Sequence, residues 1–83
     1  MTRYFFHLHN DINTPDNQGA DYPDDRSAME EALRSARDLA SHNVKEGKLD
    51  LSHFIICVDE TGREVGIVYF ADAVSVVGAS GRN

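Results

Sequence analysis

Residues 24–47 read DDRSAMEEALRSARDLASHNVKEG, and this stretch decides the fold. Its apolar residues recur at the three- and four-residue spacing of one helical face. They are Met29, Ala32, Leu33, Ala36, Leu39, Ala40 and Val44. Asp24 and Asp25, just after Pro23, are both candidates to accept hydrogen bonds from the unpaired N–H groups of a first helical turn, and Gly47 can adopt the left-handed conformation that ends a helix. The stretch therefore predicts one long amphipathic helix.

Shorter stretches on both sides of this helix have the composition of β-strands. Residues 2–9, 53–59 and 64–71 are rich in aromatic and β-branched residues, and residues 19–22 can form a short return strand. Tyr4, Phe6 and Leu8 alternate along the first strand, so they share the face that the helix should cover. In chain order the elements predict an α+β fold (β-β-α-β-β), with one long helix packed on one face of an antiparallel sheet of about four strands.

The last two strands predict a bulged hairpin with Gly62 in its turn. A register that pairs Asp59 with Arg63 also pairs Ile55 with Ile67. One face of the hairpin then carries Ile55, Cys57, Val65, Ile67 and Tyr69, and the other carries Phe54, Ile56, Val58, Val68 and Phe70. Both faces are apolar, whereas a single helix can cover only one of them.

An uncovered apolar sheet face is unusual on a soluble monomer. We therefore expect a homodimer that uses this bare face or an edge strand of the sheet. The alternative is that residues 73–77 fold back over the bare face.

Size and composition limit the remaining possibilities. The 83 residues predict one domain over residues 1–77, followed by a flexible C-terminal tail over residues 78–83. The net charge of −6, with scattered basic residues, argues against nucleic-acid binding, which depends on neutralising phosphates. No stretch has the length of a membrane span or the pattern of a signal peptide, so we expect a cytoplasmic protein that does not bind membranes.

Two histidines are the first candidates for chemistry. His7 and His9 point the same way from one strand, and Asp11 or His53 could supply a third metal ligand. Polar residues on a partly solvated strand explain the same pattern, so we expect no metal and no cofactor. The single cysteine, Cys57, lies between apolar neighbours and is expected to be buried and inert. Because the sequence lacks a nucleophile elbow or a phosphate loop, we do not expect an enzyme.

Three blocks of sequence together resemble a known family. They are RYFFHL at residues 3–8, DNQGADYPD at residues 16–24 leading into EALRSAR at residues 31–37, and VDETGR at residues 58–63 leading into FADAV at residues 70–74. The chain resembles a family of short proteobacterial proteins catalogued as a domain of unknown function. The resemblance implies a small domain without an assigned activity. It also implies candidates for a shared surface, which are Arg3, Tyr4, Phe6, His7 and residues 19–23, although Tyr4 and Phe6 can equally be core residues and Gly19 a turn residue. The full candidate surface is Arg3, His7, His9, Asp11 and His53.

Residues 22–37 are also similar to HicB-type antitoxins, in which Pro-Asp precedes a helix with Glu-Ala-Leu and Ala-Arg. Here Asp25, Arg26 and Ser27 follow Pro23-Asp24 in place of the rest of that signature. The main hypothesis is therefore a non-enzymatic, homodimeric interaction or regulatory domain that can also bind a protein partner. The alternatives are an antitoxin-like regulator that binds a partner protein, and a metal sensor or enzyme that uses His7 and His9.

Overall fold

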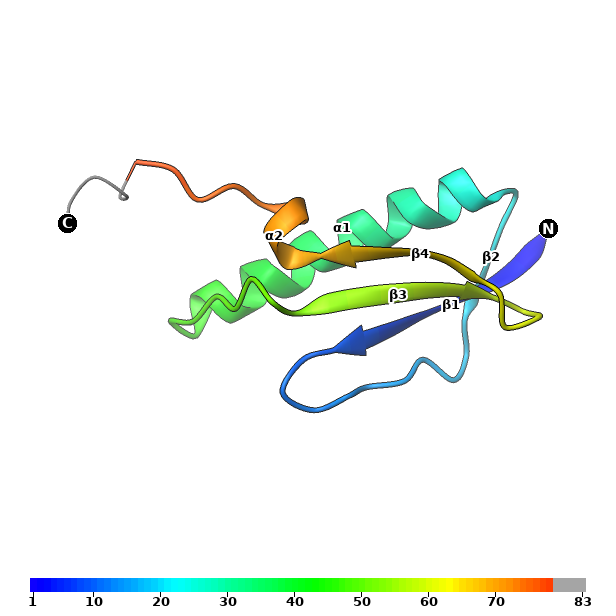
Figure 1. Ribbon diagram of the computed structural model, residues 1–83, viewed down its shortest axis with the longest axis horizontal. Helices are drawn as coiled ribbons and strands as arrows, with labels where there is room; N and C mark the ends of the chain where they lie inside the picture. The colour runs from blue at the N-terminus through cyan, green and yellow to red at the C-terminus, as the bar shows by residue number, and fades with distance from the viewer. Residues whose placement is uncertain (79–83) are drawn as a thin grey trace.

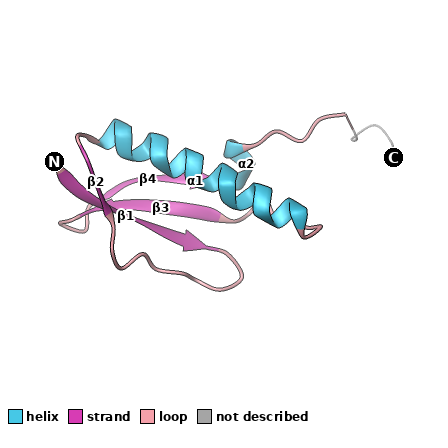
Figure 2. Ribbon diagram, turned by 180° about the vertical axis from the view of Figure 1, so that it is seen from behind, coloured by secondary structure: helices cyan, strands magenta, loops and turns pink. Residues whose placement is uncertain are grey.

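The computed structural model describes residues 1–78, and the rest of the predicted tail, residues 79–83, lies outside the described residues. The elements in chain order are β1 (Thr2–His9), β2 (Ala20–Tyr22), α1 (Asp25–Lys45), β3 (Phe54–Asp59), β4 (Glu64–Tyr69) and α2 (Phe70–Ala73). The strands form one antiparallel sheet in the order β2-β1-β3-β4. Figures 1 and 2 show α1 lying along a single side of this sheet. The predicted α+β fold is confirmed, including the short return strand.

Helix α1 begins and ends where local chemistry requires. The backbone of Asp24 is extended, and its carboxylate accepts a hydrogen bond from the backbone N–H of Ser27 at 2.8 Å. Gly47 follows the helix with a φ of 89° and donates its N–H to the carbonyl of Val44 at 2.9 Å. These contacts satisfy backbone groups that a helix otherwise leaves unpaired at its ends. Both predicted helix boundaries are thereby confirmed to within two residues.

The buried stripe of α1 consists of alanines. Ala28, Ala32, Ala36 and Ala40 are each at most 2% exposed. Because alanine side chains are short, the helix can lie close to the sheet, and Met29, Leu33 and Leu39 pack beside the stripe as partly buried residues. Val44, which the sequence placed on the buried face, is instead 56% exposed, because the stripe ends at Ala40. The largest fully buried side chains come from the sheet and from α2; they are Ile55, Cys57 and Phe70.

The predicted register of the β3–β4 hairpin is wrong beyond its turn. Val58 pairs with Glu64, but Ile55 pairs with Val68 in place of Ile67. A β-bulge at the step between Cys57 and Val58 inserts one extra residue into β4, and one such residue moves every later side chain to the opposite face. Val68 therefore points to the core side, and Ile67 turns away from α1.

The segment that the sequence assigned to the end of the last strand is the short helix α2. Phe70 donates its backbone N–H to the carbonyl of His53 at 2.9 Å, and Ala71 donates to the carbonyl of Leu51 at 3.2 Å. These bonds turn the chain onto the helix side, where Phe70 is only 1% exposed. The prediction that Phe70 lies on the same face of the hairpin as Phe54, away from Ile55, is therefore wrong.

The chain beyond α2 does not cover the far face of the sheet. Ala73 and Val74 pack into the core beside α1, whereas Val76 and Val77 are 63% and 82% exposed. Figure 1 shows this segment leading away from the sheet. The alternative in which residues 73–77 fold over the bare face is thus not what the structure shows. Within residues 1–78, neither helix has the length and apolar character needed to cross a bilayer.

Candidate functional site

The sheet face opposite α1, here called the open face, is apolar and aromatic. It carries alternate residues of β1, β3 and β4, and the bulge turns the side chains of Ile67 and Tyr69 toward it. Glu64, which pairs with Val58, places one exposed carboxylate at the end of this face. Its other residues are Phe5, His7, His9, Phe54, Ile56, Val58, Ile67 and Tyr69. Ile67 and Tyr69 are 37% and 42% exposed, and the others are half-buried because they shield one another. The open face is therefore a continuous surface built from three adjacent strands.

A row of rings crosses the open face from β1 to β4. The His9 and Phe54 rings are stacked, with centroids 4.8 Å apart and planes 4° from parallel. Phe54 then meets Tyr69 at 5.1 Å with a tilt of 45°. Both pairs arise from directly opposed positions in the ladder. These separations are those of favourable aromatic pairs, so the row is fixed before any partner binds.

One end of the open face is polar. Arg3 lies 3.5 Å from the carboxylate of Asp21 on β2, and its Nη1 donates to the carbonyl of Gln18 at 2.7 Å. The backbone N–H of Arg3 donates to the Glu60 carboxylate at 3.0 Å. The apolar surface thus ends at a charged rim.

The loop over residues 10–19 closes the edge of β1. Thr14 exchanges two backbone hydrogen bonds with Leu8, at 2.9 and 3.0 Å. Asp16 accepts from the backbone N–H of Phe6 at 3.1 Å, and its own N–H donates to Nδ1 of His7 at 3.0 Å. A strand edge with its backbone groups occupied cannot pair with another chain. This loop therefore occupies the outer edge of β1, and β4 forms the other edge of the sheet.

A second cluster lies on the helix side of the sheet, where β3 begins. His53 is only 8% exposed, and its Nε2 lies 3.3 Å from Oδ2 of Asp50 and 3.8 Å from Oδ1 of Asp11. Within the described residues, neither ring nitrogen of His53 makes a hydrogen bond. The cluster faces a polar cavity of about 170 Å³. That cavity is lined by Asn10, Asp11, Asn43, Glu46, Lys48, Asp50 and His53.

The five residues predicted as a candidate surface are divided between these two regions. His7 and His9 lie on the open face, and Arg3 lies at its rim. Asp11 and His53 come together on the helix side, away from the two strand histidines. The structure therefore joins Asp11 with His53 but does not join either of them with His7 and His9.

Sequence reasoning missed Asp50. Its Oδ1 accepts from the backbone N–H of Ser52 at 2.9 Å and from the Ser52 hydroxyl at 2.6 Å. This local turn leaves Oδ2 directed at His53. The order Asp50-Leu51-Ser52-His53 is a signal for this arrangement, because Asp followed two residues later by Ser forms such turns.

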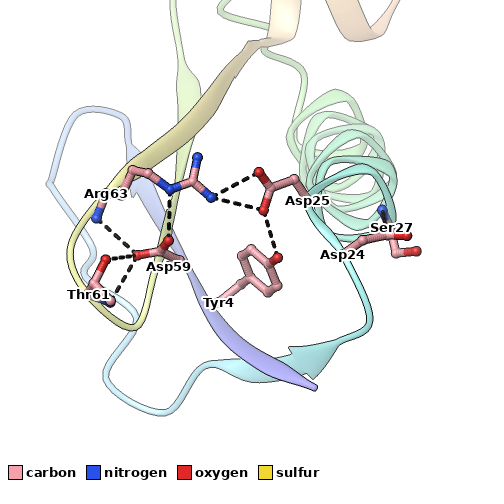
Figure 3. A network of polar contacts seen from close by, with 7 residues as sticks. All are labelled: Tyr4, Asp24, Asp25, Ser27, Asp59, Thr61 and Arg63. Carbon is pink, nitrogen blue, oxygen red and sulfur yellow. Dashed lines mark hydrogen bonds and ion pairs between the residues drawn. The ribbon is translucent and has the colours of Figure 1, made fainter.

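A polar network joins the β3–β4 turn to the start of α1 (Figure 3). Asp59 accepts three hydrogen bonds at Oδ1, from the Thr61 hydroxyl and from the backbone N–H groups of Thr61 and Arg63. Arg63 binds Oδ2 of Asp59 through Nε at 3.0 Å and both carboxylate oxygens of Asp25 through Nη2. The Tyr4 hydroxyl donates to Asp25 at 2.7 Å. These contacts give Asp59, Thr61 and Arg63 of the VDETGR block a structural role.

This network should make stability depend on pH. The Thr61 hydroxyl, with the N–H groups and guanidinium around it, lowers the pKa of Asp59 from 3.8 to about 2. Since the folded state holds the proton more weakly than the unfolded chain, the stabilisation is complete above about pH 4 and is lost as the pH falls toward 2. Asp59→Asn should therefore destabilise the protein at pH 7, and its deficit relative to wild type should shrink toward pH 2. Urea unfolding at a series of pH values measures this difference.

Asp38→Asn is the matched control, because Asp38 is an exposed aspartate of α1 without a hydrogen bond or ion pair in the described residues. It should follow the wild-type pH profile. An Asp59→Asn deficit that is constant with pH would contradict the role assigned to the carboxylate charge.

Cys57 lies in the core, as predicted. Its side chain is fully buried, and burial raises the pKa of its thiol to about 11. A thiol with so little thiolate at neutral pH is a poor nucleophile and a poor metal ligand. Cys57 therefore acts as a small apolar core residue.

Comparison with known proteins identifies one family. The family described as "Domain of unknown function (DUF6894)" matches residues 3–71, which run from β1 to the second residue of α2. No curated protein and no solved structure matches the chain. The matched range contains both the open face and the His53 cluster.

Proposed function

The chain belongs to the DUF6894 family of unknown function. We propose that it is a non-enzymatic interaction domain that dimerises through the open face. The observation that carries this proposal is the uncovered, apolar sheet face. Its three strands span roughly 20 Å by 14 Å. That is roughly 300 Å² of surface, comparable with the largest apolar patch on a typical monomer, and such patches often have a binding role.

A second copy of the same chain is the occupant that the charge distribution favours. The sequence contains 14 acidic and 8 basic residues, so two copies repel one another over most of their surface. Apart from Glu64, which pairs with Val58 at the polar end, the open face contains no carboxylate among its residues. Apolar centre and charged rim, with Arg3 and Asp21 at the edge, are the usual arrangement of a protein interface. Two copies placed face to face would bury their aromatic rows against each other.

The proposal predicts that Ile67→Lys yields a monomer. Ile67 is exposed and lies beside Ile56 on the open face, so the substitution places an unpaired ammonium between two apolar sheets. Dimerisation should weaken at least about a hundredfold, which corresponds to about 2.7 kcal/mol. Sedimentation velocity over a range of protein concentrations measures the effect. Because an interface of this size is smaller than a stable protein–protein interface usually is, wild type should dissociate on dilution.

Val44→Lys provides the control, since Val44 is an equally replaceable aliphatic residue that is 56% exposed on α1. It should dimerise as wild type does. A wild-type protein that stays monomeric at high concentration, or an Ile67→Lys variant that still dimerises, would overturn the proposal.

In the alternative of an antitoxin-like regulator, a different protein would occupy the open face. Co-purification of a stoichiometric partner that Ile67→Lys abolishes and Val44→Lys retains would favour that alternative over self-association.

A further inference from the structure

We propose that Asp11, Asp50 and His53 form a binding site for one divalent transition-metal ion, with Zn²⁺ as the ion that fits best. Imidazole nitrogen together with carboxylate oxygens is a ligand set that Zn²⁺ accepts readily, whereas Mg²⁺ and Ca²⁺ prefer oxygen alone. This site lies on the helix side of the sheet and does not depend on the proposed function. It also departs from the expectation that the chain holds no metal.

The first observation is that the imidazole of His53 is buried and makes no hydrogen bond. His53 is only 8% exposed, and both of its ring nitrogens lack a hydrogen-bond partner in the described residues. An unsatisfied buried polar atom is costly, so native proteins nearly always provide a partner for it. Packing holds the ring in place, because it meets the Phe70 ring edge-on at 5.6 Å. His53 lines the cavity, and its Nε2 lies 3.3 Å from Oδ2 of Asp50, so an ion held between these two atoms would give Nε2 a partner.

The geometry of the three ligand atoms is the second observation. One oxygen of Asp11, one oxygen of Asp50 and a nitrogen of His53 all lie within 4.8 Å of one another. Tetrahedral Zn²⁺ with bonds of about 2.0–2.1 Å needs ligand atoms about 3.4 Å apart. Asp50 already meets this distance, at 3.3 Å from His53. Asp11 lies on a loop with its side chain 74% exposed, so a small movement brings it to the ion.

The charges around the cavity favour a cation. Its lining contains the carboxylates of Asp11, Glu46 and Asp50 but one ammonium, that of Lys48. The cavity also adjoins the C-terminal end of α1, where the helix dipole is negative. Lys48 lies 3.6 Å from Oδ2 of Asp11, where it neutralises part of this charge. A metal ion would therefore compete with the Lys48 ammonium for Asp11.

The test is a titration of the full-length, chelator-stripped protein with ZnCl₂, followed by calorimetry. Wild type should bind one ion per chain. Asp11→Asn and His53→Gln should each weaken binding at least about tenfold, since even outer-shell partners of metal ligands contribute about 10–100-fold. Lys48→Met should strengthen binding, because it removes the competing ammonium. His9→Ala and Asp38→Asn should bind as wild type does.

One variant and one further measurement separate loss of metal binding from loss of folding. Asp11→Asn alters an exposed loop side chain, so it reports on binding even if His53→Gln fails to fold. Nuclear magnetic resonance of the imidazole nitrogens should show a large shift for His53 on addition of Zn²⁺, and little for His9. The proposal is overturned if wild type does not bind Zn²⁺, if Asp11→Asn binds equally well, or if His9→Ala is the variant that loses the ion.

Discussion

Phe70→Ala is expected to lower the free energy of unfolding by about 3–5 kcal/mol, the usual cost of emptying a buried phenylalanine site. Phe70 is 1% exposed and belongs to the same core cluster as Ala36 and Ala40 of the alanine stripe. These alanines have no side chain that could move into the vacated space, and the β3 strand beneath is held by its ladder. An 83-residue domain has a total stability of about 4–12 kcal/mol, so a large part of it would be lost. Urea unfolding followed by circular dichroism measures the change.

The neighbouring residue supplies the control for this prediction. Tyr69 has a side chain of similar size, but it lies on the open face and is 42% exposed. Tyr69→Ala should cost less than about 1.5 kcal/mol, chiefly through its aromatic contact with Phe54. Equal losses for the two variants would mean that the strand continues through Phe70, as the sequence suggested, and that α2 does not form.

The fold was predictable where local signals agreed with one another. In residues 24–47 the apolar spacing, Asp24 at the start and Gly47 at the end all indicate the same helix, and the structure contains it. Alternation in residues 2–9 likewise placed Tyr4 on the core side. Such patterns can be recognised in the sequence because each depends only on residues close together in the chain.

The hairpin shows where such reasoning fails. Gly62 correctly indicated a turn, and the pairing nearest that turn is as predicted. The extra residue of the bulge is Val65, which lies between the paired residues Glu64 and Gly66. The one local signal is Gly66, since an isolated glycine inside a strand suggests a bulge but does not fix its position. Gly66 lies so close to α1 that a Cβ there would be 2.8 Å from Met29, a contact that exists only in the folded chain. One unpredicted residue thus reassigned Ile67, Val68 and Tyr69.

The candidate site was predictable only as a set of residue types. Asp11 and His53 are both recognisable as possible ligands, but the sequence groups them with His7 and His9, the pair that points the same way from one strand. The structure brings Asp11, Asp50 and His53 together from the loop after β1 and the connector after α1. Such proximity depends on strand pairing between β1 and β3, which spacing along the chain does not encode.

The loop over residues 10–19 connects the two surfaces proposed here. At one end it carries Asp11 to the His53 cluster, and in its middle Asp16 closes the β1 edge and binds His7. Its other end is Gly19, which donates its N–H to Asp16 at 3.0 Å before β2 begins. Anchoring this loop should therefore matter for stability and for both surfaces.

Gly19→Ala is accordingly expected to lower the free energy of unfolding by about 2–5 kcal/mol. Gly19 has a φ of 69°, a left-handed conformation that costs an L-residue about 1–2 kcal/mol. A Cβ at this position would also lie 2.7 Å from the carbonyl oxygen of Tyr4 and 2.9 Å from the Phe5 ring. Forcing these atoms apart should add about 1–3 kcal/mol, as overpacking usually does. Urea unfolding measures the total.

Gly47→Ala separates the two contributions. Gly47 also has a positive φ, of 89°, but a Cβ there would meet nothing within 4 Å. That variant should lose only the conformational part, about 1–2 kcal/mol. The excess loss of Gly19→Ala over Gly47→Ala then measures how tightly the loop is held against β1. Equal losses would show that the loop is loosely attached, and a loosely attached loop could neither close the β1 edge nor hold Asp11 near His53.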